Sequence, residues 1–455
     1  MKSMLRLIAG VLLFSCLLTF GLWRYDVIPD FSAVTQFAQS AADRVAGVVD
    51  RITGAFPTDP NGHYPTYTLA EPPGDELVKA ICDGLDAHSS SIDVSGHGLT
   101  DETVGAVMAW VRYTRPEYFY VNGSFSYEKT KGGKEVVNIL PQYLYDAPTT
   151  AGMMAEYNAV LDEIEEGAPT GSDFDRLLYL HVYFIQNYSY DQTLTIRDAH
   201  TFFTQKTGVC QAYMLALIAA ADRLGIRSLP VTSDAMKHAW NLVLLDGAWY
   251  HVDLTWDDSV SLPTQTSYTY FLQSSQGLVN ADVARGGNVE RDPASVHHSW
   301  ETAENADEST KYDNAAWREA LSPMVKCGDT YYCVVTEPNS ESTTARGGLY
   351  GGTDPAALTR LSDITGKWQP DATHYYVNCY AGLVVYGGKL IYNTPRAICS
   401  YDPATGQHQE LKRYLLQNTW AIYGLFGISE TGELGCLLAT APEGGSQQLL
   451  QCQIS

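Results

Sequence analysis

A tight hairpin is the clearest element in the pattern of apolar and polar residues along this chain. Residues 238–245 read HAWNLVLL, an apolar run rich in the aromatic and β-branched residues that strands favour. The pair Asp246-Gly247 follows as a signal for a two-residue type I′ turn, and residues 248–254, AWYHVDL, provide a return strand. Because a two-residue loop fixes the pairing register, the facing residues of the two strands can be assigned directly.

The predicted register puts chemically active side chains on one face of the hairpin. Trp240 faces Asp253 in this register, and alternate residues of each strand point to the same side. The residues expected on this face are His238, Trp240, Trp249, His251 and Asp253. Asp253 is then a diagonal neighbour of His238 at a Cβ separation of about 7–8 Å or somewhat less, which a hydrogen bond between the two side chains spans. Asp257 is the alternative diagonal partner, but it lies beyond the expected end of the strand.

An apolar helix is predicted over residues 209–224, with Gly225 as the residue that ends it. The residues that recur at helical spacing on its core face are Tyr213, Leu217, Ala220 and Leu224. Gly208 allows a sharp turn into the helix, so Cys210 lies in the first turn, where the unpaired N–H groups and the helix dipole favour a thiolate. An isolated cysteine is more often a small core residue, and it is the histidine and aspartate of the hairpin that favour a functional thiol here.

Three pieces of sequence in a fixed order carry a resemblance to a known family. They are GVCQAY at residues 208–213, HAWN at residues 238–241 and WYHVDLTWDD at residues 249–258. Over about residues 171–275 the chain resembles the transglutaminase-like superfamily, a papain-related fold with a Cys-His-Asp site, and residues 175–191 resemble the helix that leads into its core. Family members often have Gly where Ala212 stands, and we expect little effect because Ala is also small.

The resemblance implies an α+β, papain-like core in which a thiol, an imidazole and a carboxylate act as nucleophile, base and orienting group. It assigns Cys210 as the nucleophile, His238 as general base and then acid, and Asp253 as the group that orients His238. The backbone N–H of Cys210 is one expected oxyanion donor. The supporting residues expected around the site are Trp240, Asn241, Tyr190, Gln205 and Gln211, the last three as alternatives for a second oxyanion donor.

An α/β extension is expected before the core, which we place at residues 171–320. The extension covers residues 76–170, and its expected helices lie at residues 76–88, 100–114 and 149–166. A pair of strands, residues 118–121 and 124–127, is expected around the turn signal Asn122-Gly123. Residues 276–320, at the end of the core, are polar and are expected to be irregular.

Residues 321–455 are expected to form an all-β domain. The predicted strands are residues 331–336, 382–386, 389–392, 397–401, 423–429, 434–439 and 449–454. Residues 399–406 resemble a blade motif of β-propellers, but a region of this length provides about three blades of about 40–45 residues each, too few to close a ring. A sandwich or a partial propeller-like sheet is therefore expected. Its many Tyr and Trp residues either bind a glycan or protein ligand or pack in its core.

The N-terminus predicts export across a membrane. Residues 7–23 form an uncharged apolar run that follows Lys2 and Arg6, although a membrane span usually needs about 20 residues. Residues 1–30 are therefore expected to be a signal anchor with the bulk of the chain outside the cytoplasmic membrane, and a cleaved signal peptide with secretion is the alternative. Residues 31–75 are expected to form a helix and a linker that space the chain from the membrane. Together with the resemblance, this indicates a protein of the bacterial cell envelope.

Composition removes several other classes of function. The net charge of −23 argues against nucleic acid and anionic membrane surfaces as partners. The cysteines of the last third, which lack Cys-x-x-Cys spacing, are Cys327, Cys333, Cys379, Cys399, Cys436 and Cys452. They form either one or two disulfides or separate buried thiols. His297-His298 lacks a third zinc ligand and Asp257-Asp258 lacks the spacing of a calcium loop, so neither a metal nor another cofactor is expected.

These features together predict an extracytoplasmic cysteine enzyme that forms an acyl-thioenzyme with protein or peptide substrates at the cell surface. Water as the acceptor makes it a protease or amidase, and an amine makes it a protein cross-linking enzyme. The sequence leaves both open, and hydrolysis is favoured only by analogy with the fold. The alternative from another class is a non-catalytic surface scaffold or adhesion protein whose core and β domain bind a partner.

Overall fold

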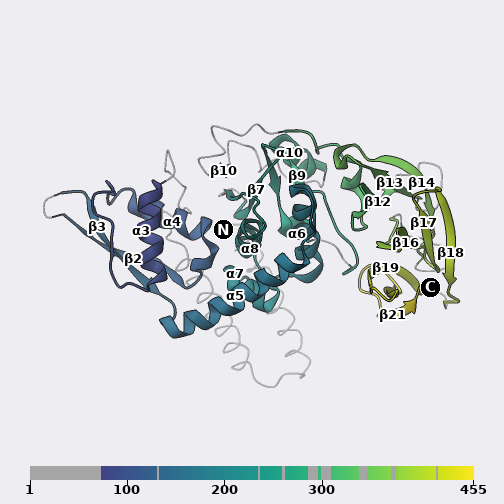
Figure 1. Ribbon diagram of the computed structural model, residues 1–455, viewed down its shortest axis with the longest axis horizontal. Coiled ribbons are helices and arrows are strands. Elements are labelled where there is room, and N and C mark those ends of the chain that lie inside the picture. The colour runs from purple at the N-terminus through teal and green to yellow at the C-terminus, as the bar shows by residue number, and fades with distance from the viewer. Residues whose placement is uncertain are drawn as a thin grey trace, which may run out of the picture. The chain divides into compact units, whose positions relative to one another are not determined.

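The computed structural model describes most of the chain from residue 73 onward (Figure 1). The described residues are 73–130, 133–233, 236–258, 262–284, 296–298, 309–337, 346–369, 376, 378–416 and 419–454. Nearly all of them belong to one unit made of residues 67–121 and 126–455, whereas residues 122–125 are grouped with residues 1–66 in a second unit. No helix within the described ranges is apolar and long enough to cross a membrane. The apolar run at residues 7–23, on which the predicted signal or anchor rests, lies outside the described residues.

The extension before the core combines helices with a small sheet. Its elements are α3 (Asp75–Asp86), β1 (Ile92–Asp93), α4 (Val104–Thr114), the 3-10 helix η1 (Pro116–Tyr118), β2 (Val121–Lys129), β3 (Val136–Tyr143) and α5 (Ala147–Gly167). The strands form a sheet of order β1-β3-β2. The three predicted helices are present, but the predicted turn at Asn122-Gly123 is wrong, because β2 runs through both residues. The chain reverses later, where the N–H of Thr130 donates to the carbonyl of Glu135 at 2.9 Å.

The core has a helical layer and a five-stranded sheet. Its helical part contains α6 (Asp173–Asn187), β4 (Ser189–Tyr190), α7 (Ala199–Gln205), β5 (Thr207–Gly208) and α8 (Cys210–Arg223). The sheet has the order β10-β6-β7-β8-β9. The strands of this sheet and the two helices between them are, in chain order, β6 (Ser228–Ser233), β7 (His238–Leu245), β8 (Ala248–Val252), α9 (Leu254–Asp257), β9 (Phe271–Gln273), α10 (Ser275–Ala284) and β10 (Val296–His298). The segment predicted to be irregular therefore includes a helix, α10.

The predicted hairpin is present with the predicted register. Leu245 pairs with Ala248 in the β7–β8 ladder, and the two turn residues Asp246 and Gly247 have φ angles of 52° and 82°, as a type I′ turn requires. The return strand is shorter than the apolar pattern predicts, because β8 ends at Val252 and α9 begins two residues later. This early end places the residue between them at the start of a helix.

Helix α8 lies inside the core and is apolar on almost every side. All residues from Ala212 to Ala221 are buried, and the helix packs against α5, α6 and α7 as well as the strands β6 and β7 (Figure 1). A helix that is apolar all round needs cover of this kind. It ends at Arg223, and Gly225 follows with a φ of 73°, as predicted for the residue that closes it. The N-terminus of α8 is thereby held in a fixed place against β7.

The C-terminal region is all-β, as predicted, and forms three consecutive sheets. The first contains β11 (Val325–Cys327), β12 (Thr330–Glu337), β13 (Arg346–Gly352) and β14 (Thr359–Thr365). The second contains β15 (Leu383–Tyr386), β16 (Lys389–Asn393), β17 (Ala397–Asp402) and β18 (Gln407–Arg413), and the third contains β19 (Ala421–Ile428), β20 (Glu433–Ala439) and β21 (Gln447–Gln453). In each sheet the strands neighbour one another in sequence order. Such meanders are the topology of propeller blades.

The seven strands predicted for this region are all present, and four others were missed. The missed strands are β11, β13, β14 and β18. In β18 most side chains are exposed, and β13 is rich in glycine, so neither shows the apolar alternation on which the prediction depends. The cysteines among the described residues are free thiols, and five of those in this region are buried.

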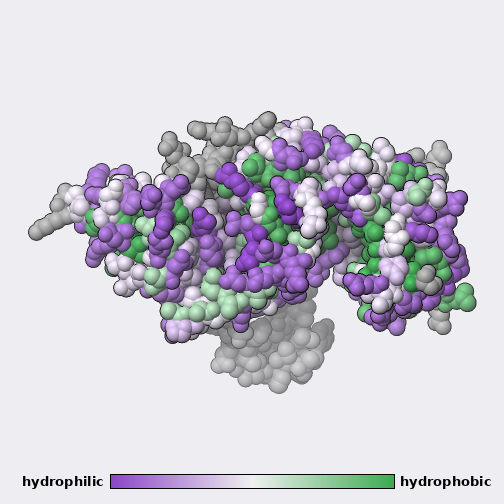
Figure 2. Space-filling model, in the orientation of Figure 1, coloured by the Kyte–Doolittle hydropathy of each residue, from purple (hydrophilic) through white to green (hydrophobic). Residues whose placement is uncertain are grey.

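Polar contacts join the first of these sheets to the core. The carboxylate of Asp175, which forms a capping box with the N-cap Ser172 of α6, accepts hydrogen bonds from Lys326 at 2.8 Å and from the Tyr331 hydroxyl at 2.6 Å. Burial opposes the charge of Asp175, but these partners hold its pKa below the ordinary value. Figure 2 shows hydrophilic residues spread over one face of the molecule, with patches of hydrophobic residues between them.

Candidate active site

Cys210 is the first residue of α8, and its position is set by a short parallel pairing just before the helix. β4 pairs with β5, with Tyr190 opposite Gly208. The N–H of Val209 donates to the carbonyl of Ile196 at 2.9 Å. Because the backbone is tied on both sides, the start of α8 has little freedom to move.

The loop that supplies the carbonyl of Ile196 is organised by one carboxylate. Asp191 accepts backbone hydrogen bonds from Thr193 and Thr195 at 2.8 Å and from Ile196 at 2.9 Å. Burial opposes the charge of Asp191, but these bonds and those from the threonine hydroxyls hold its pKa well below the ordinary value. Asp191 therefore keeps this loop in a single shape beside the helix start.

The turn into α8 requires glycine at position 208. A Cβ atom there would lie 2.6 Å from Cδ2 of Phe202 and 2.7 Å from the Cβ of Ala212. The close approach brings Cys210 into the first turn, where helix geometry leaves backbone N–H groups unpaired. The positive end of the helix dipole there favours a thiolate.

The β7–β8 hairpin delivers an imidazole to this thiol. Nε2 of His238 lies 2.7 Å from Oδ2 of Asp253, so the structure contains the predicted diagonal hydrogen bond. The side chain of His238 is 8% exposed and that of Asp253 is fully buried, which shields the bond from water. The imidazole is also hydrogen-bonded to the thiol of Cys210. Since Nε2 faces the carboxylate, Nδ1 is the nitrogen available to exchange a proton with the thiol.

Asp253 is held in place by its own position at the start of a helix. It is the N-cap of α9, and its Oδ1 accepts the N–H of Trp256 at 3.1 Å. Its backbone N–H donates to the carbonyl of Tyr270 at 3.0 Å. One oxygen of the carboxylate therefore caps the helix while the other faces His238.

The electrostatics of the site favour charge on both reacting groups. Burial alone lowers the pKa of His238, but the charge and hydrogen bond of Asp253 and the contact with Cys210 outweigh it and raise that pKa to about 9. Burial alone raises the pKa of Cys210, but the hydrogen bond and charge of His238 and the N–H of Ala239 hold it below its ordinary value. The two shifts favour a thiolate–imidazolium pair at neutral pH.

Two tryptophans lie against the imidazole. The ring of Trp240 stacks on His238 with centroids 5.6 Å apart, and the ring of Trp256 lies at 5.7 Å. The indole N–H of Trp240 donates to Nδ1 of His251 at 2.9 Å, and Nε2 of His251 lies 3.1 Å from the hydroxyl of Ser275. This chain of hydrogen bonds fixes the Trp240 ring and leaves the His238 imidazole little room to rotate.

The segment that carries this arrangement matches a known family. Residues 158–254 match the model of the transglutaminase-like superfamily. These residues form a transglutaminase-like core. The resemblance predicted from the three motifs is confirmed by this match, and so is the α+β class.

Two solved structures are similar to parts of the chain. One is a provisionally assigned cysteine protease from Cytophaga hutchinsonii, with 14% identity over 29% of this chain and 61% of that chain and a TM-score of 0.20. The other is described as a TGase, with 14% identity over 30% of this chain and 45% of that chain and a TM-score of 0.20. The chain thus spans less than two thirds of the length of either structure. A comparison with curated protein sequences gave no match.

Asn241 supports the transglutaminase-like core from the opposite face of β7. Its side-chain N–H groups donate to the carbonyl of Met214 on α8 at 3.0 Å and to the hydroxyl of Ser228 at 3.1 Å. Since the side chain is almost fully buried, these bonds tie the strand of His238 to the helix of Cys210. Asn241 therefore contacts neither reacting group directly.

The three residues considered as second oxyanion donors lie in different environments. Tyr190 is half-buried, and its pKa is raised mainly by burial and next by the charge of the nearby Cys210 thiol. Gln211 follows Cys210 on α8, and its Oε1 is buried with no hydrogen-bond donor among the described residues. Gln205 is the exposed last residue of α7. Burial and adjacency to the thiol thus favour Tyr190 and Gln211 over Gln205.

Asp257, the alternative partner considered for His238, has a different set of contacts. Its Oδ1 accepts the hydroxyl of Ser267 at 2.7 Å, and both its oxygens lie 3.1 Å from the N–H of Tyr270. The carboxylate therefore fixes the segment after α9. In the described ranges, no group of three or more His, Cys, Asp and Glu side chains is arranged to hold a metal ion.

Sequence reasoning missed three contributors to the site. The N–H of Ala239 bonds the thiol, the N–H of Trp256 orients Asp253, and His251 fixes the Trp240 ring. Two of these contributions come from the backbone, which leaves no residue signature. His251 was placed on the correct face of the hairpin, but nothing in the sequence indicates its hydrogen bond.

Proposed function

We propose that this chain is a cysteine acyltransferase or hydrolase of transglutaminase-like type, which attacks peptide or carboxamide carbonyls. The observation that carries the proposal is the contact of His238 with both Asp253, at 2.7 Å, and the Cys210 thiol. A nucleophile at a helix N-terminus, a base beside it and a buried carboxylate behind the base provide the three roles that acyl transfer needs.

In the acylation step, the Cys210 thiolate attacks the carbonyl carbon, a C–S bond forms, and the carbonyl electrons move to the oxygen. The backbone N–H of Cys210 in the first turn of α8 stabilises this oxyanion. The oxyanion then collapses, the C–N bond breaks, and the His238 imidazolium gives its proton to the leaving amine. A thioester on Cys210 and a free amine result. Asp253 keeps the imidazole oriented and stabilises its positive charge before the proton leaves.

In the second step an acceptor attacks the thioester carbonyl while neutral His238 removes its proton. The C–S bond breaks and the thiolate is restored. Water as acceptor gives a carboxylic acid, and a primary amine gives a new amide bond. We favour hydrolysis of peptide or isopeptide bonds as the main outcome, and amine transfer is distinguished from it by product analysis.

A thioester trap tests the proposal. The protein is incubated with a peptide carboxamide or thioester probe, and the adduct is located by mass spectrometry. We expect the acyl group on Cys210 and its loss in Cys210→Ala. Cys82→Ala is the matched control, because Cys82 is a half-buried thiol whose pKa is raised by burial, and this variant is expected to react like the wild type. Acylation that persists in Cys210→Ala would falsify the proposal.

Partition between acceptors is measured with the same probe. A primary amine such as cadaverine is added to the acyl-enzyme, and the acid and amide products are compared. Predominance of the acid assigns a protease or amidase, and predominance of the amide assigns a cross-linking enzyme. If the thioester forms but neither product appears, Cys210 is a reactive thiol without turnover, and the enzymatic proposal is wrong.

We further propose that the bulk of the chain acts outside the cytoplasmic membrane of a bacterial cell, on peptide or protein substrates at the cell surface. The support is the apolar run at residues 7–23 after a basic N-terminus. Protease added to intact spheroplasts is expected to degrade the core, and protection of the core would contradict this placement. Binding of a glycan or protein by the C-terminal sheets is a separate proposal, tested by pull-down with cell-wall glycan and surface-protein fractions.

A further inference from the structure

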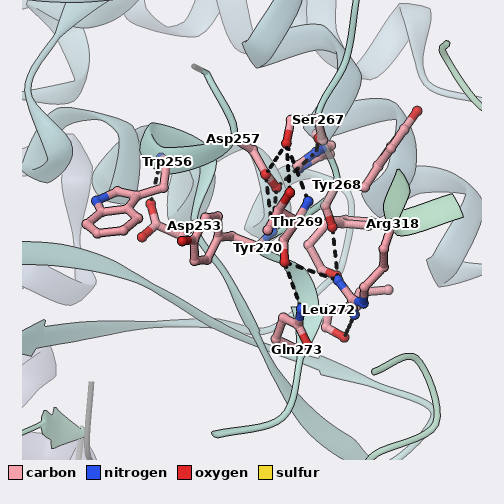
Figure 3. A network of polar contacts seen from close by, with 12 residues as sticks. Asp253, Trp256, Asp257, Ser267, Tyr268, Thr269, Tyr270, Leu272, Gln273 and Arg318 are labelled. Carbon is pink, nitrogen blue, oxygen red and sulfur yellow. Dashed lines mark hydrogen bonds and ion pairs between the residues drawn. The ribbon is translucent and has the colours of Figure 1, made fainter. Parts of the chain in front are cut away.

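Arg318 lies outside the segment that matches the transglutaminase-like model, yet it contacts the backbone that supports Asp253. It belongs to the 3-10 helix η3 (Ala316–Glu319), in the stretch that follows the core sheet. Among the residues that the structure describes, its guanidinium donates hydrogen bonds to backbone carbonyls alone. Three of the acceptors are Tyr268 at 2.9 Å, Thr269 at 3.3 Å and Leu272 at 2.9 Å (Figure 3). The others are Phe271 at 2.9 Å, Tyr312 at 3.1 Å and Asp313 at 3.0 Å.

This set of contacts is suited to holding one backbone shape. Arginine has five N–H donors in a rigid planar arrangement, and here four of the acceptors lie in the five residues 268–272. One of these residues, Leu272, has a φ of 54°, a left-handed conformation that a leucine rarely adopts. A buried cation saturated by carbonyls stabilises this bend where the chain alone does not favour it.

The charge of Arg318 is retained in this position. Burial lowers the pKa of the guanidinium, and the carboxylates of Asp313 and Asp257 oppose that effect, which leaves the pKa at about 10. Asp313 reinforces the same region, since its carboxylate accepts the N–H of Ser274 at 2.9 Å and the Ser274 hydroxyl at 2.6 Å. The segment that contains Arg318 and Asp313 therefore holds the backbone from residue 268 to residue 274 by hydrogen bonds.

The bend held by Arg318 contacts both ends of α9. Its middle residue, Tyr270, accepts the backbone N–H of Asp253 at 3.0 Å and donates its own N–H to the Asp257 carboxylate at 3.1 Å (Figure 3). Asp253 is the N-cap of α9 and Asp257 is its last residue. The neighbouring residue Phe271 pairs with Val252, which directly precedes Asp253. The orientation of the Asp253 carboxylate toward His238 thus depends on the shape of this bend.

We propose that Arg318 is a positioning residue for the Cys210–His238–Asp253 site, which it serves by fixing the bend at residues 268–272 on which Asp253 is anchored. The inference rests on the proposed function of that site. It gives the region after the matched residues 158–254 a role in the reaction, because the arginine that shapes the bend lies more than sixty residues beyond Asp253. Arg318 acts through Asp253 and does not contact the reacting groups.

The pH dependence of Cys210 alkylation by iodoacetamide tests this role, with the Cys210 peptide quantified by mass spectrometry. The test variant is Arg318→Lys, which keeps the charge but cannot reach all the carbonyls. Loosening the bend weakens the His238–Asp253 contact and therefore raises the apparent pKa of the thiol. We expect the apparent pKa of the thiol to rise by about one unit. At a pH below the alkylation midpoints of both proteins, this rise makes alkylation about tenfold slower. Arg360→Lys is the matched control, because Arg360 pairs with Glu337 on the C-terminal sheets, and its profile should equal that of the wild type.

Two further variants separate positioning from general stability. Asp253→Asn is expected to shift the profile in the same direction by a larger amount, and Arg318→Lys combined with Asp253→Asn should shift it no further. The inference is overturned if a folded Arg318→Lys protein has the wild-type pH profile of alkylation. It is also overturned if the double variant shows the full sum of the two single shifts. If Arg318→Lys does not fold, Asp257→Asn loosens the same bend from its other side, and an unchanged profile in that variant overturns the inference as well. An ordinary thiol profile in the wild type instead refutes the proposed function itself.

Discussion

The carboxylate of Asp253 is the group that makes His238 a cation at neutral pH, and Asp253→Asn removes its charge while keeping its shape. Asn is as good an N-cap as Asp, so α9 is expected to remain. Burial lowers the pKa of His238, and Asp253 provides the largest opposing contribution that raises it from 6.5 to about 9. That rise corresponds to about 3 kcal/mol in favour of the imidazolium.

Little of this energy is lost to screening by water. The side chain of His238 is 8% exposed and that of Asp253 is fully buried. Without the carboxylate, burial acts on the imidazole almost unopposed, so we expect the pKa of His238 to fall by at least two units. The imidazolium no longer stabilises the Cys210 thiolate, and both alkylation and acyl transfer are expected to slow by about a hundredfold near pH 7.

The assay is the rate of iodoacetamide alkylation of Cys210 between pH 5 and pH 10, read from the Cys210 peptide. Asp246→Asn is the matched control, because Asp246 lies in the turn of the same hairpin, is 67% exposed, and occupies a left-handed conformation that Asn tolerates. The wild type should alkylate well below the pH at which an ordinary thiol ionises, and Asp253→Asn should not. Equal profiles for the two proteins would refute the claim that Asp253 charges the pair.

Urea unfolding gives an independent check with a defined sign. The folded-state pKa of His238 lies above its unfolded value of 6.5, so its contribution to the free energy of unfolding is fully present below pH 6.5. That contribution is lost as the pH rises through about 9. The wild type should therefore have a higher free energy of unfolding than Asp253→Asn, and the difference should be largest near pH 6.5. This difference should become smaller as the pH approaches 9. A gap that widens as the pH rises from 6.5 to 9 contradicts this assignment.

Two substitutions beside α8, at Gly208 and Asp258, test packing and charge. Gly208→Ala places a Cβ 2.6 Å from a ring carbon of Phe202 and 2.7 Å from the Cβ of Ala212, and we expect a loss of about 1–3 kcal/mol in urea unfolding together with slower alkylation of the thiol. Wild-type stability and reactivity would contradict the crowding argument. Burial raises the pKa of Asp258 from 3.8 to about 7, although the Tyr213 hydroxyl donates to its carboxylate, so the folded state loses stability as the pH rises from 3.8 through about 7. Asp258→Asn should remove this loss and raise the urea midpoint relative to wild type by more at pH 8 than at pH 5, whereas an equal change at both values rules out the titration.

The hairpin was predictable because its information is local. A two-residue turn sets the register, and the alternation of side chains then assigns the face of every residue. His238 and Asp253 could therefore be paired from sequence, and the hydrogen bond between them is present at 2.7 Å. The position of Cys210 was predictable for a similar reason, since Gly208 and an apolar run define where α8 begins.

The remaining features depend on contacts between distant parts of the chain. Asn122-Gly123 is a strong local turn signal, but β2 continues through it, because the pairing of whole strands outweighs a single dipeptide. Arg318 has no motif around it, and its partners are backbone carbonyls, which every residue possesses. No spacing or composition in the sequence indicates that this arginine reaches the segment that anchors Asp253.

The geometry of Asp253 depends on the place where β8 stops being a strand. An extended strand through Leu254, as the apolar pattern predicts, would leave the Asp253 Cβ about 7–8 Å from that of His238, with nothing to direct the carboxylate. The ladder instead ends at Val252, and α9 begins at Leu254. The requirement for an N-cap then turns the carboxylate toward the N–H of Trp256, which takes Oδ1 and leaves Oδ2 facing the imidazole.

This division of one carboxylate between two partners limits which residues can stand at position 253. Serine or threonine caps a helix well, but each offers a single oxygen and no charge. Asparagine offers the cap and the shape without the charge, and alanine offers neither. Both variants cap α9 and lack the charge, but only asparagine keeps the shape, so comparison of Asp253→Ser with Asp253→Asn separates loss of shape from loss of charge. If both variants keep α9 but only a charged residue keeps the thiol reactive at pH 6, the helix start orients the carboxylate and its charge sustains the ion pair.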